Sequence, residues 1–164
     1  MDRTSEYKKM SNEGLVDLLL NRYHKKLRYD VLTITPLFER VVNVHGNSHN
    51  TLAAAKNLFD KVVAHLQFHL TKEEQMLFPA LVQLSDLNQF KALKGPIYCM
   101  RSDHQHDDED LKQLKILMDD FVPPLGACQS YQKLMVLLRE FVEDTFEHMK
   151  IENEILFPRF EVEG

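Results

Sequence analysis

The chain has 164 residues, with 20 basic and 25 acidic side chains and a formal net charge of −5. This length suits one ordinary domain with its own hydrophobic core, while the acidic balance argues against nucleic acid or an anionic membrane as the main partner. Five glycines and six prolines are too few for a turn-rich β sandwich, and no apolar run is long enough to cross a membrane.

Four segments have apolar residues three and four positions apart, which predicts four amphipathic helices. Their apolar stripes run, in chain order, over residues 20–41, 52–80, 97–118 and 134–155. Turn-forming residues separate them at 45–48, at 85–88 together with 95–96, and at 123–126. Pro36 lies inside the first segment, where we expect it to kink or interrupt the helix.

Short connections between four such helices predict an all-α fold, an antiparallel up-down four-helix bundle. We expect residues 1–164 to form a single domain of this kind, with about the first 12 residues as a loose N-terminal extension. The start of the sequence is charged and lacks the apolar segment of a signal peptide, so we expect a cytoplasmic protein.

Two of the apolar stripes contain polar residues at mid-length. The pattern H-x3-E-x3-L-F-P occurs twice, beginning at His69 and at His148. A histidine and a glutamate four positions apart lie on one face of a helix, with a rise of about 6 Å between them. Glu73 and Glu152 therefore share the inward face with these histidines. Burying such groups without partners costs several kcal/mol, so we expect something to bind them.

His24 and His104 complete a cluster at the same height in the bundle. His24 precedes His69 by 45 residues, and His104 precedes His148 by 44. Counted from the loops, all four histidines lie roughly 28 to 33 Å from one end of the bundle, so the chain resembles a duplicated helical hairpin with a pseudo-twofold axis. The predicted metal ligands are His24, His69, Glu73, His104, His148 and Glu152.

Four imidazoles and two carboxylates offer two cations two histidines each, with both glutamates free to bridge. This donor set suits iron, manganese or zinc, and bridging carboxylates leave coordination positions open for a small ligand. The ferritin-like di-iron plan uses Glu-x-x-His instead, so this pattern is a different one. The H-E-x-x-H motif of zinc proteases is absent, so we do not expect a hydrolase.

Other candidate residues have simpler interpretations. His45 ends the first helix, about 32 Å from the cluster, and is typical of a helix C-terminus. His65 lies one turn before the first repeated motif. It could lie near the site or line its entrance, but we expect a partly exposed histidine without such a role. Asp107-Asp108 either supports a ligand from outside the cluster or belongs to a solvated acidic run. Cys99 and Cys128 make no disulfide framework, and we expect them to be small buried side chains.

Further residues carry a resemblance that covers the chain from about Gly14. They are Tyr23-His24, Leu27-Arg28, Val44-His45-Gly46, the block from His69 to Pro79, Gly95-Pro96-Ile97 with Met100 and His104, Pro123-Pro124 with Cys128, and the block from His148 to Pro158. In these positions the sequence resembles the hemerythrin-like family, and within it the di-iron proteins that repair iron centres. Such repair proteins often begin with a small domain bearing paired cysteines, and in this sequence almost nothing precedes the first helix.

The resemblance implies two iron ions in an oxo- or hydroxo-bridged centre, with the four histidines as ligands and the two glutamates as bridges. It also implies a role in nitrosative and oxidative stress, in which the protein meets nitric oxide or reactive oxygen and helps repair damaged iron–sulfur clusters. Iron supply and nitric oxide handling are both open as the means. One alternative is a protein that binds or senses dioxygen or nitric oxide without turnover, and another is an enzyme that reduces nitric oxide.

Two positions bear on this choice. Oxygen-carrying members have a fifth histidine one turn from another on the third helix, whereas the positions flanking His104 here are Met100 and Asp108. This difference favours the stress role over oxygen transport. The family often has a glutamate just before the third-helix histidine, where this chain has Asp103. The client protein, the electron donor and the oligomeric state are left open by the sequence.

Overall fold

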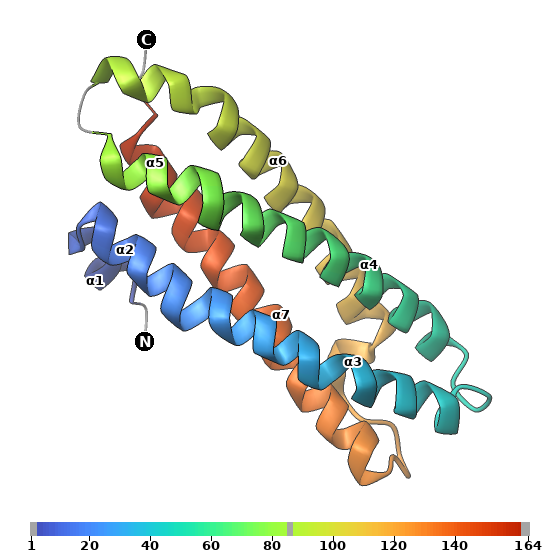
Figure 1. Cartoon of the computed structure of the whole chain (residues 1–164). Coiled ribbons are helices and arrows are strands. Elements are labelled where there is room, and N and C mark those ends of the chain that lie inside the picture. Colours follow the sequence, from blue (N-terminus) through green and yellow to red (C-terminus); the bar gives the residue numbers. More distant parts are fainter. Residues whose placement is uncertain (1–2, 85–86, 162–164) are drawn as a thin grey trace.

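The computed structural model describes residues 3–84 and 87–161, and within these ranges the regular structure is entirely helical (Figure 1). The α-helices are α1 (Thr4–Lys9), α2 (Asn12–Leu18), α3 (Lys25–His45), α4 (Thr51–Lys72), α5 (Phe78–Gln83), α6 (Leu87–Leu117) and α7 (Gln129–Ile151). The π-helical turns are η1 (Leu19–His24), η2 (Glu73–Leu77) and η4 (Glu152–Leu156), and the short 3-10 turns are η3 (Asp119–Phe121) and η5 (Phe157–Arg159). The predicted all-α class is therefore confirmed.

The π-helical turns join α-helices into long continuous rods. The η1 turn links α2 to α3, η2 links α4 to α5, and η4 follows α7 directly. Side by side, α3 packs against α4 and α7, and α4 packs against α6 (Figure 1). None of the described helices combines the length and the apolar character that a bilayer crossing requires.

Two apolar clusters fill the interior, one toward each end of the rods. The larger cluster joins α3, α4, α6 and α7, and at its centre the ring of Phe59 lies 5.6 Å from the rings of both Phe38 and Phe141. The smaller cluster joins α1, α2, α5, the start of α6 and the residues after α7. Each fully buried large apolar side chain contributes about 1.5–3 kcal/mol to folding. The six predicted ligands belong to neither cluster.

Proline residues do not interrupt the helices as the sequence suggested. Helix α3 runs through Pro36, and α6 begins at Leu87 and runs through Gly95-Pro96, so the expected boundary at 95–96 was wrong. A proline deprives the carbonyl four residues earlier of its partner. Before Pro36 this residue is Leu32, which is 75% exposed, so water can take the place of the missing donor. Of the turn predicted at 85–88, residues 85–86 lie outside the described residues, while 87–88 belong to α6, so that part of the prediction was wrong.

The N-terminal segment also differs from the expected loose extension. Residues Thr4–Lys9 form α1, and Tyr7 is buried in the smaller apolar cluster. The guanidinium of Arg159 donates hydrogen bonds to the carbonyl of Met10 at 2.8 Å and to Oδ1 of Asn12 at 2.9 Å. An apolar side chain and a C-terminal arginine thus hold this segment against the rods.

Candidate metal centre

The six predicted ligands converge between the two apolar clusters. They form two groups, and in each group one ligand atom per residue lies within 4.8 Å of the others. The first group is His24, Glu73, His148 and Glu152, and the second is His69, Glu73, His104 and Glu152. All six side chains are at most 2% exposed. Helices separated by more than 100 residues in the sequence thus meet at one buried site.

Both carboxylates belong to both groups. Oε2 of Glu73 lies 3.4 Å from Nε2 of His24, while Oε1 of Glu73 lies 3.0 Å from Nε2 of His69. Glu152 has the same arrangement, with Oε1 3.9 Å from Nε2 of His24 and Oε2 3.0 Å from Nε2 of His104. Each carboxylate therefore directs one oxygen toward each half of the site.

Three of the six residues lie at π-helical turns. His24 is the last residue of η1, Glu73 is the first of η2, and Glu152 is the first of η4. A π turn carries one more residue per hydrogen-bonded loop than an α turn, and such turns occur often at functional sites. Helical periodicity alone did not predict them. The L-F-P that ends both repeated motifs begins at the last residue of η2 and of η4, whereas no such sequence accompanies η1.

Asp107 supports His69 from outside the cluster. Nδ1 of His69 donates a hydrogen bond to Oδ2 of Asp107 at 3.0 Å, and Nδ1 of His65 donates to Oδ1 of the same carboxylate at 2.6 Å. Asp107 is buried, whereas the side chain of His65 is 30% exposed. Of the two interpretations of Asp107-Asp108, the supporting role is thus the one that Asp107 fulfils. His65 connects this support to the surface.

Two other histidines also have outer partners, which the sequence did not reveal. Nδ1 of His24 donates to Oε1 of Glu74 at 2.9 Å, and the other oxygen of Glu74 accepts from Arg28 at 3.1 Å. Nδ1 of His104 donates to the amide oxygen of Asn153 at 2.8 Å. Glu74 and Asn153 each follow a predicted bridging glutamate by one residue, a position that helical periodicity places off the inward face.

The carboxylates and imidazoles shift one another's protonation in the metal-free chain. Burial alone would lower the pKa of His24, but the carboxylates of Glu152 and Glu73 raise it to about 9. Burial alone would raise the pKa of Glu73, but the positive charge of His69 and the nearby His104 and His24 hold it well below its usual range. Burial lowers the pKa of His148 to about 4, which keeps this imidazole neutral.

His69 and His104 face each other directly. Their Nε2 atoms are 3.0 Å apart. Burial alone would lower the pKa of His104, but the carboxylates of Glu152 and Glu73 raise it to about 9. The pKa of His69 is likewise raised well above its usual value, because the charge of Glu73 and the hydrogen bond to Asp107 outweigh burial. At neutral pH the metal-free site therefore holds protons where cations would otherwise bind.

Most of the polar atoms at the site have no hydrogen-bond partner. Of the eight such buried side-chain atoms among the described residues, seven belong to the cluster: Nε2 of His24, both carboxylate oxygens of Glu73 and of Glu152, and both ring nitrogens of His148. Leaving buried carboxylates without hydrogen bonds costs several kcal/mol, and bound cations remove this cost. The donor set thus fits a pair of cations.

Comparison with known proteins also indicates cation binding. The family model described as the hemerythrin HHE cation binding domain matches residues 17–160. The chain belongs to this hemerythrin family. It is 32% identical over 145 residues to a probable iron-sulfur cluster repair protein of Haemophilus influenzae, a match that covers 88% of this chain and 63% of the relative. It is also 32% identical over 146 residues to the iron-sulfur cluster repair protein YtfE of Yersinia pseudotuberculosis and of Yersinia pestis, covering 89% of this chain and 64% of each relative.

The chain spans slightly less than two thirds of the length of these relatives. The family match extends over all six clustered residues and over most of the two apolar clusters. Membership in the hemerythrin family therefore concerns the part of the chain that forms the site.

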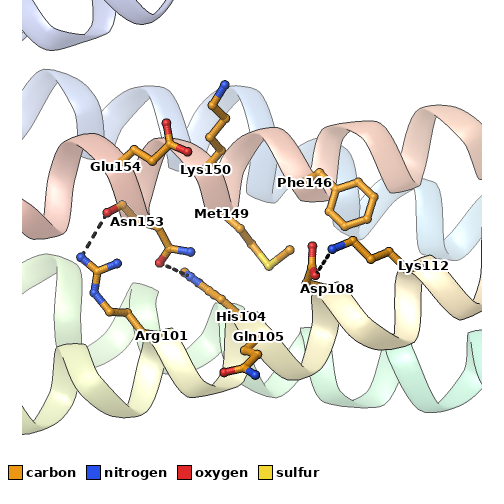
Figure 2. Close-up of a pocket in the computed structure, with 10 residues that line it drawn as sticks. All are labelled: Arg101, His104, Gln105, Asp108, Lys112, Phe146, Met149, Lys150, Asn153 and Glu154. Carbon is orange, nitrogen blue, oxygen red and sulfur yellow. Dashed lines mark hydrogen bonds and ion pairs between the residues drawn. The ribbon is translucent and has the colours of Figure 1, made fainter.

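A surface cavity borders one histidine of the cluster. The cavity holds about 530 Å³ between α6 and α7, and it reaches His104 on the side of Nδ1. Figure 2 shows Asn153 pointing from η4 toward His104, and Arg101 pointing toward the backbone carbonyl of Asn153. Asp108 forms an ion pair with Lys112 on the rim and belongs to neither ligand group. Asn153 thus lies between the cavity and the buried cluster.

The remaining candidates lie away from the site. His45 is the last residue of α3, where its Nε2 atom contacts Sγ of Cys128 at 3.1 Å and its ring packs against Tyr131. The prediction that Cys99 and Cys128 are buried was wrong, because both are exposed. Cys99 follows the exposed Gly95-Pro96 stretch of α6, and Cys128 directly precedes α7.

Proposed function

We propose that the chain is a non-haem di-iron protein of the nitrosative and oxidative stress response, which helps repair damaged iron–sulfur clusters by supplying iron or by handling nitric oxide. The observation that carries this proposal is the presence of two neighbouring ligand groups that share both carboxylates. The relatives are named as iron-sulfur cluster repair proteins, which supports the choice of client. This chain spans less than two thirds of the length of these relatives, so we propose their repair function for it on the strength of the shared domain.

In this proposal, His24 and His148 bind one iron ion, His69 and His104 bind the other, and Glu73 and Glu152 bind both. Bound iron would supply one-electron redox chemistry and open coordination positions for a small ligand such as nitric oxide or dioxygen. The carboxylates balance part of the charge of two cations. Asp107, Glu74 and Asn153 orient three of the imidazoles through their Nδ1 atoms. The apolar clusters on both sides limit access of water.

We further propose that the rods form an antiparallel up-down four-helix bundle in a single domain over residues 1–164, with the two hairpins related by a pseudo-twofold axis. The repeated H-x3-E-x3-L-F-P motif and the matched contacts support this arrangement, since α3 packs on α7 as α4 packs on α6. The cytoplasmic location expected from the sequence belongs to the same proposal.

Iron transfer to an apo-iron–sulfur protein tests the function. The purified chain is loaded anaerobically with ferrous iron and mixed with an apo-ferredoxin, sulfide and a reductant, and cluster formation is followed by absorbance. We expect faster cluster formation than with the His69→Ala variant carrying the same total iron. Equal rates for the two proteins would show that the site does not supply iron.

The alternative is a protein that binds or senses dioxygen or nitric oxide without turnover. The complete burial of the six residues favours it, because a site at most 2% exposed admits a diatomic gas more readily than it releases a hydrated cation. Gas uptake by the reduced protein distinguishes the two functions. Binding that is reversed under vacuum, without iron transfer, would favour the alternative.

A further inference from the structure

The internal repeat allows the two halves of the site to be compared position by position. His69, Glu73 and Glu74 in the first half correspond to His148, Glu152 and Asn153 in the second, each 79 residues later. His24 corresponds to His104, 80 residues later, and three residues further along the same helices Leu27 corresponds to Asp107.

The first pair of outer partners is similar in the two halves. His24 donates its Nδ1 proton to Glu74 at 2.9 Å, and His104 donates its own to Asn153 at 2.8 Å. In each case the partner is the residue that directly follows the shared glutamate of the adjacent rod. One imidazole of each cation position is therefore oriented in the same way.

The second pair of outer partners differs. His69 on α4 donates to Asp107 on α6 at 3.0 Å. By the repeat, His148 on α7 should receive the same support from position 27 on α3, and α3 does pack against α7. Position 27 is a leucine, which is fully buried and has no polar atom to offer. Accordingly, His148 is 0% exposed and neither of its ring nitrogens has a hydrogen-bond partner.

An unsupported imidazole is a weaker ligand than a supported one. A carboxylate or amide acceptor on the second ring nitrogen fixes the tautomer and the ring orientation and makes the binding nitrogen more basic. Both imidazoles of the His69–His104 position have such an acceptor, whereas only His24 has one in the other position. The shared carboxylates are common to both positions, so they do not compensate for the difference.

We propose that the two cation positions are unequal, and that the position formed by His24 and His148 gives up its cation first because Leu27 provides no acceptor for His148. The inference rests on the proposed two-cation site and specifies which part of it exchanges. The cation at the His69–His104 position, where Asp107 supports His69, is then the one that is retained. Asp107 is then a positioning residue, and the lack of a polar side chain at the corresponding position 27 sets the order of release.

Release kinetics test the order directly. The protein is loaded with ferrous iron under nitrogen, the iron per chain is determined, and excess ferrozine is added in a stopped-flow instrument. We expect two phases of equal amplitude, one iron ion each, with rates about tenfold apart, at the lower end of what a lost outer partner costs in metal affinity. Two ions that leave in a single phase would overturn the inference and leave the proposed function standing. Fewer than two bound ions would instead defeat the two-cation site itself.

Two substitutions identify which position gives each phase. Asp107→Asn weakens the acceptor of His69, so we expect the slow phase to accelerate several-fold and the fast phase to stay unchanged. Leu27→Asn supplies an acceptor to His148, so we expect the fast phase to slow. Asp108→Asn is the matched control, since Asp108 pairs with Lys112 on the surface and should change neither phase. Acceleration of the fast phase alone by Asp107→Asn would contradict the assignment, even if the Leu27 variant fails to fold.

Discussion

Oδ2 of Asp107 accepts a hydrogen bond from Nδ1 of His69 at 3.0 Å, and this contact turns Nε2 of the imidazole toward Glu73, 3.0 Å away. At metal sites a histidine commonly binds the cation through one ring nitrogen and donates a hydrogen bond to a carboxylate from the other. The carboxylate thereby fixes which ring nitrogen is available to the cation. The structure extends this line to His65, whose Nδ1 atom donates to the second oxygen of Asp107 at 2.6 Å. A buried ligand is thereby linked to a half-buried residue.

The shared carboxylates give the first prediction. Glu73→Gln and Glu152→Gln keep the shape of the side chain but remove a negative charge from between two cations. We expect iron content to fall from about two ions per chain to one or fewer. The loss of metal affinity should exceed the roughly 10–100-fold drop that is typical when an outer partner is removed. Elemental analysis of purified protein measures this.

Glu154→Gln is the control for the carboxylate variants, because Glu154 is exposed and lies outside both ligand groups. Glu74→Gln is unsuitable as a neutral control, since Glu74 accepts a hydrogen bond from His24. If Glu73→Gln and Glu154→Gln retain the same iron, then Glu73 does not bind the metals.

The residues of the cluster could be predicted from the sequence, because their positions follow from helix geometry. A rise of 1.5 Å per residue and a period of 3.6 place His69 and Glu73 on one inward face. The same arithmetic places His24 and His104 at their height. The structure brings all six residues into two overlapping groups. Periodicity suffices here because the ligands lie on long helices that hold their register.

The partners of these residues could not be predicted in the same way. Whether Asp107 faces His69 depends on the rotation of α6 against α4, which side-chain packing decides and a single sequence does not show. Asn153 and Glu74 come within reach of their histidines at π-helical turns, where ordinary helical spacing no longer holds. The exposure of Cys128 similarly depends on where the loop before α7 lies.

The histidine ligands give the second prediction. His69→Ala removes one proposed ligand, and Glu73 and Asp107 each lose one of their imidazole partners. We expect iron content to fall by at least half and the free energy of unfolding to drop by about 2–4 kcal/mol, as for a buried polar network that loses one member. His45→Ala is the control, because His45 contacts Cys128 at the other end of α3. An equal loss of iron in both variants would contradict the assigned site.

Removal of the metal gives the third prediction. In the metal-free chain, the oxygens of Glu73 and Glu152 are buried without hydrogen-bond partners. A ligand at 1,000 times its dissociation constant stabilises the folded state by about 4 kcal/mol. For a chain of this size, we expect chelation to lower Tm by roughly 10 °C. Calorimetry before and after chelation and after ferrous iron is restored measures the shift. A Tm that chelation leaves unchanged would mean that the buried carboxylates need no cation.

The effect of pH gives the fourth prediction. The pKa values of His24 and His104 are raised to about 9 in the folded, metal-free chain, above the ordinary value of 6.5, because the buried carboxylates of Glu152 and Glu73 outweigh the effect of burial. The stability that these two groups contribute is therefore complete below pH 6.5 and is lost as the pH rises toward 9. Cation binding requires neutral imidazoles, so affinity should rise over the same interval.

The gap in Tm between the iron-loaded and the metal-free protein should accordingly widen from pH 6.5 to pH 9. Binding should also release protons at neutral pH, which calorimetry in two buffers of different ionisation enthalpy would detect. His148 does not contribute to this change, because burial lowers its pKa to about 4 and it is already neutral. Glu154→Gln should reproduce the wild-type profile. A gap that is constant or narrows between pH 6.5 and pH 9 would show that protons and cations do not compete for these imidazoles.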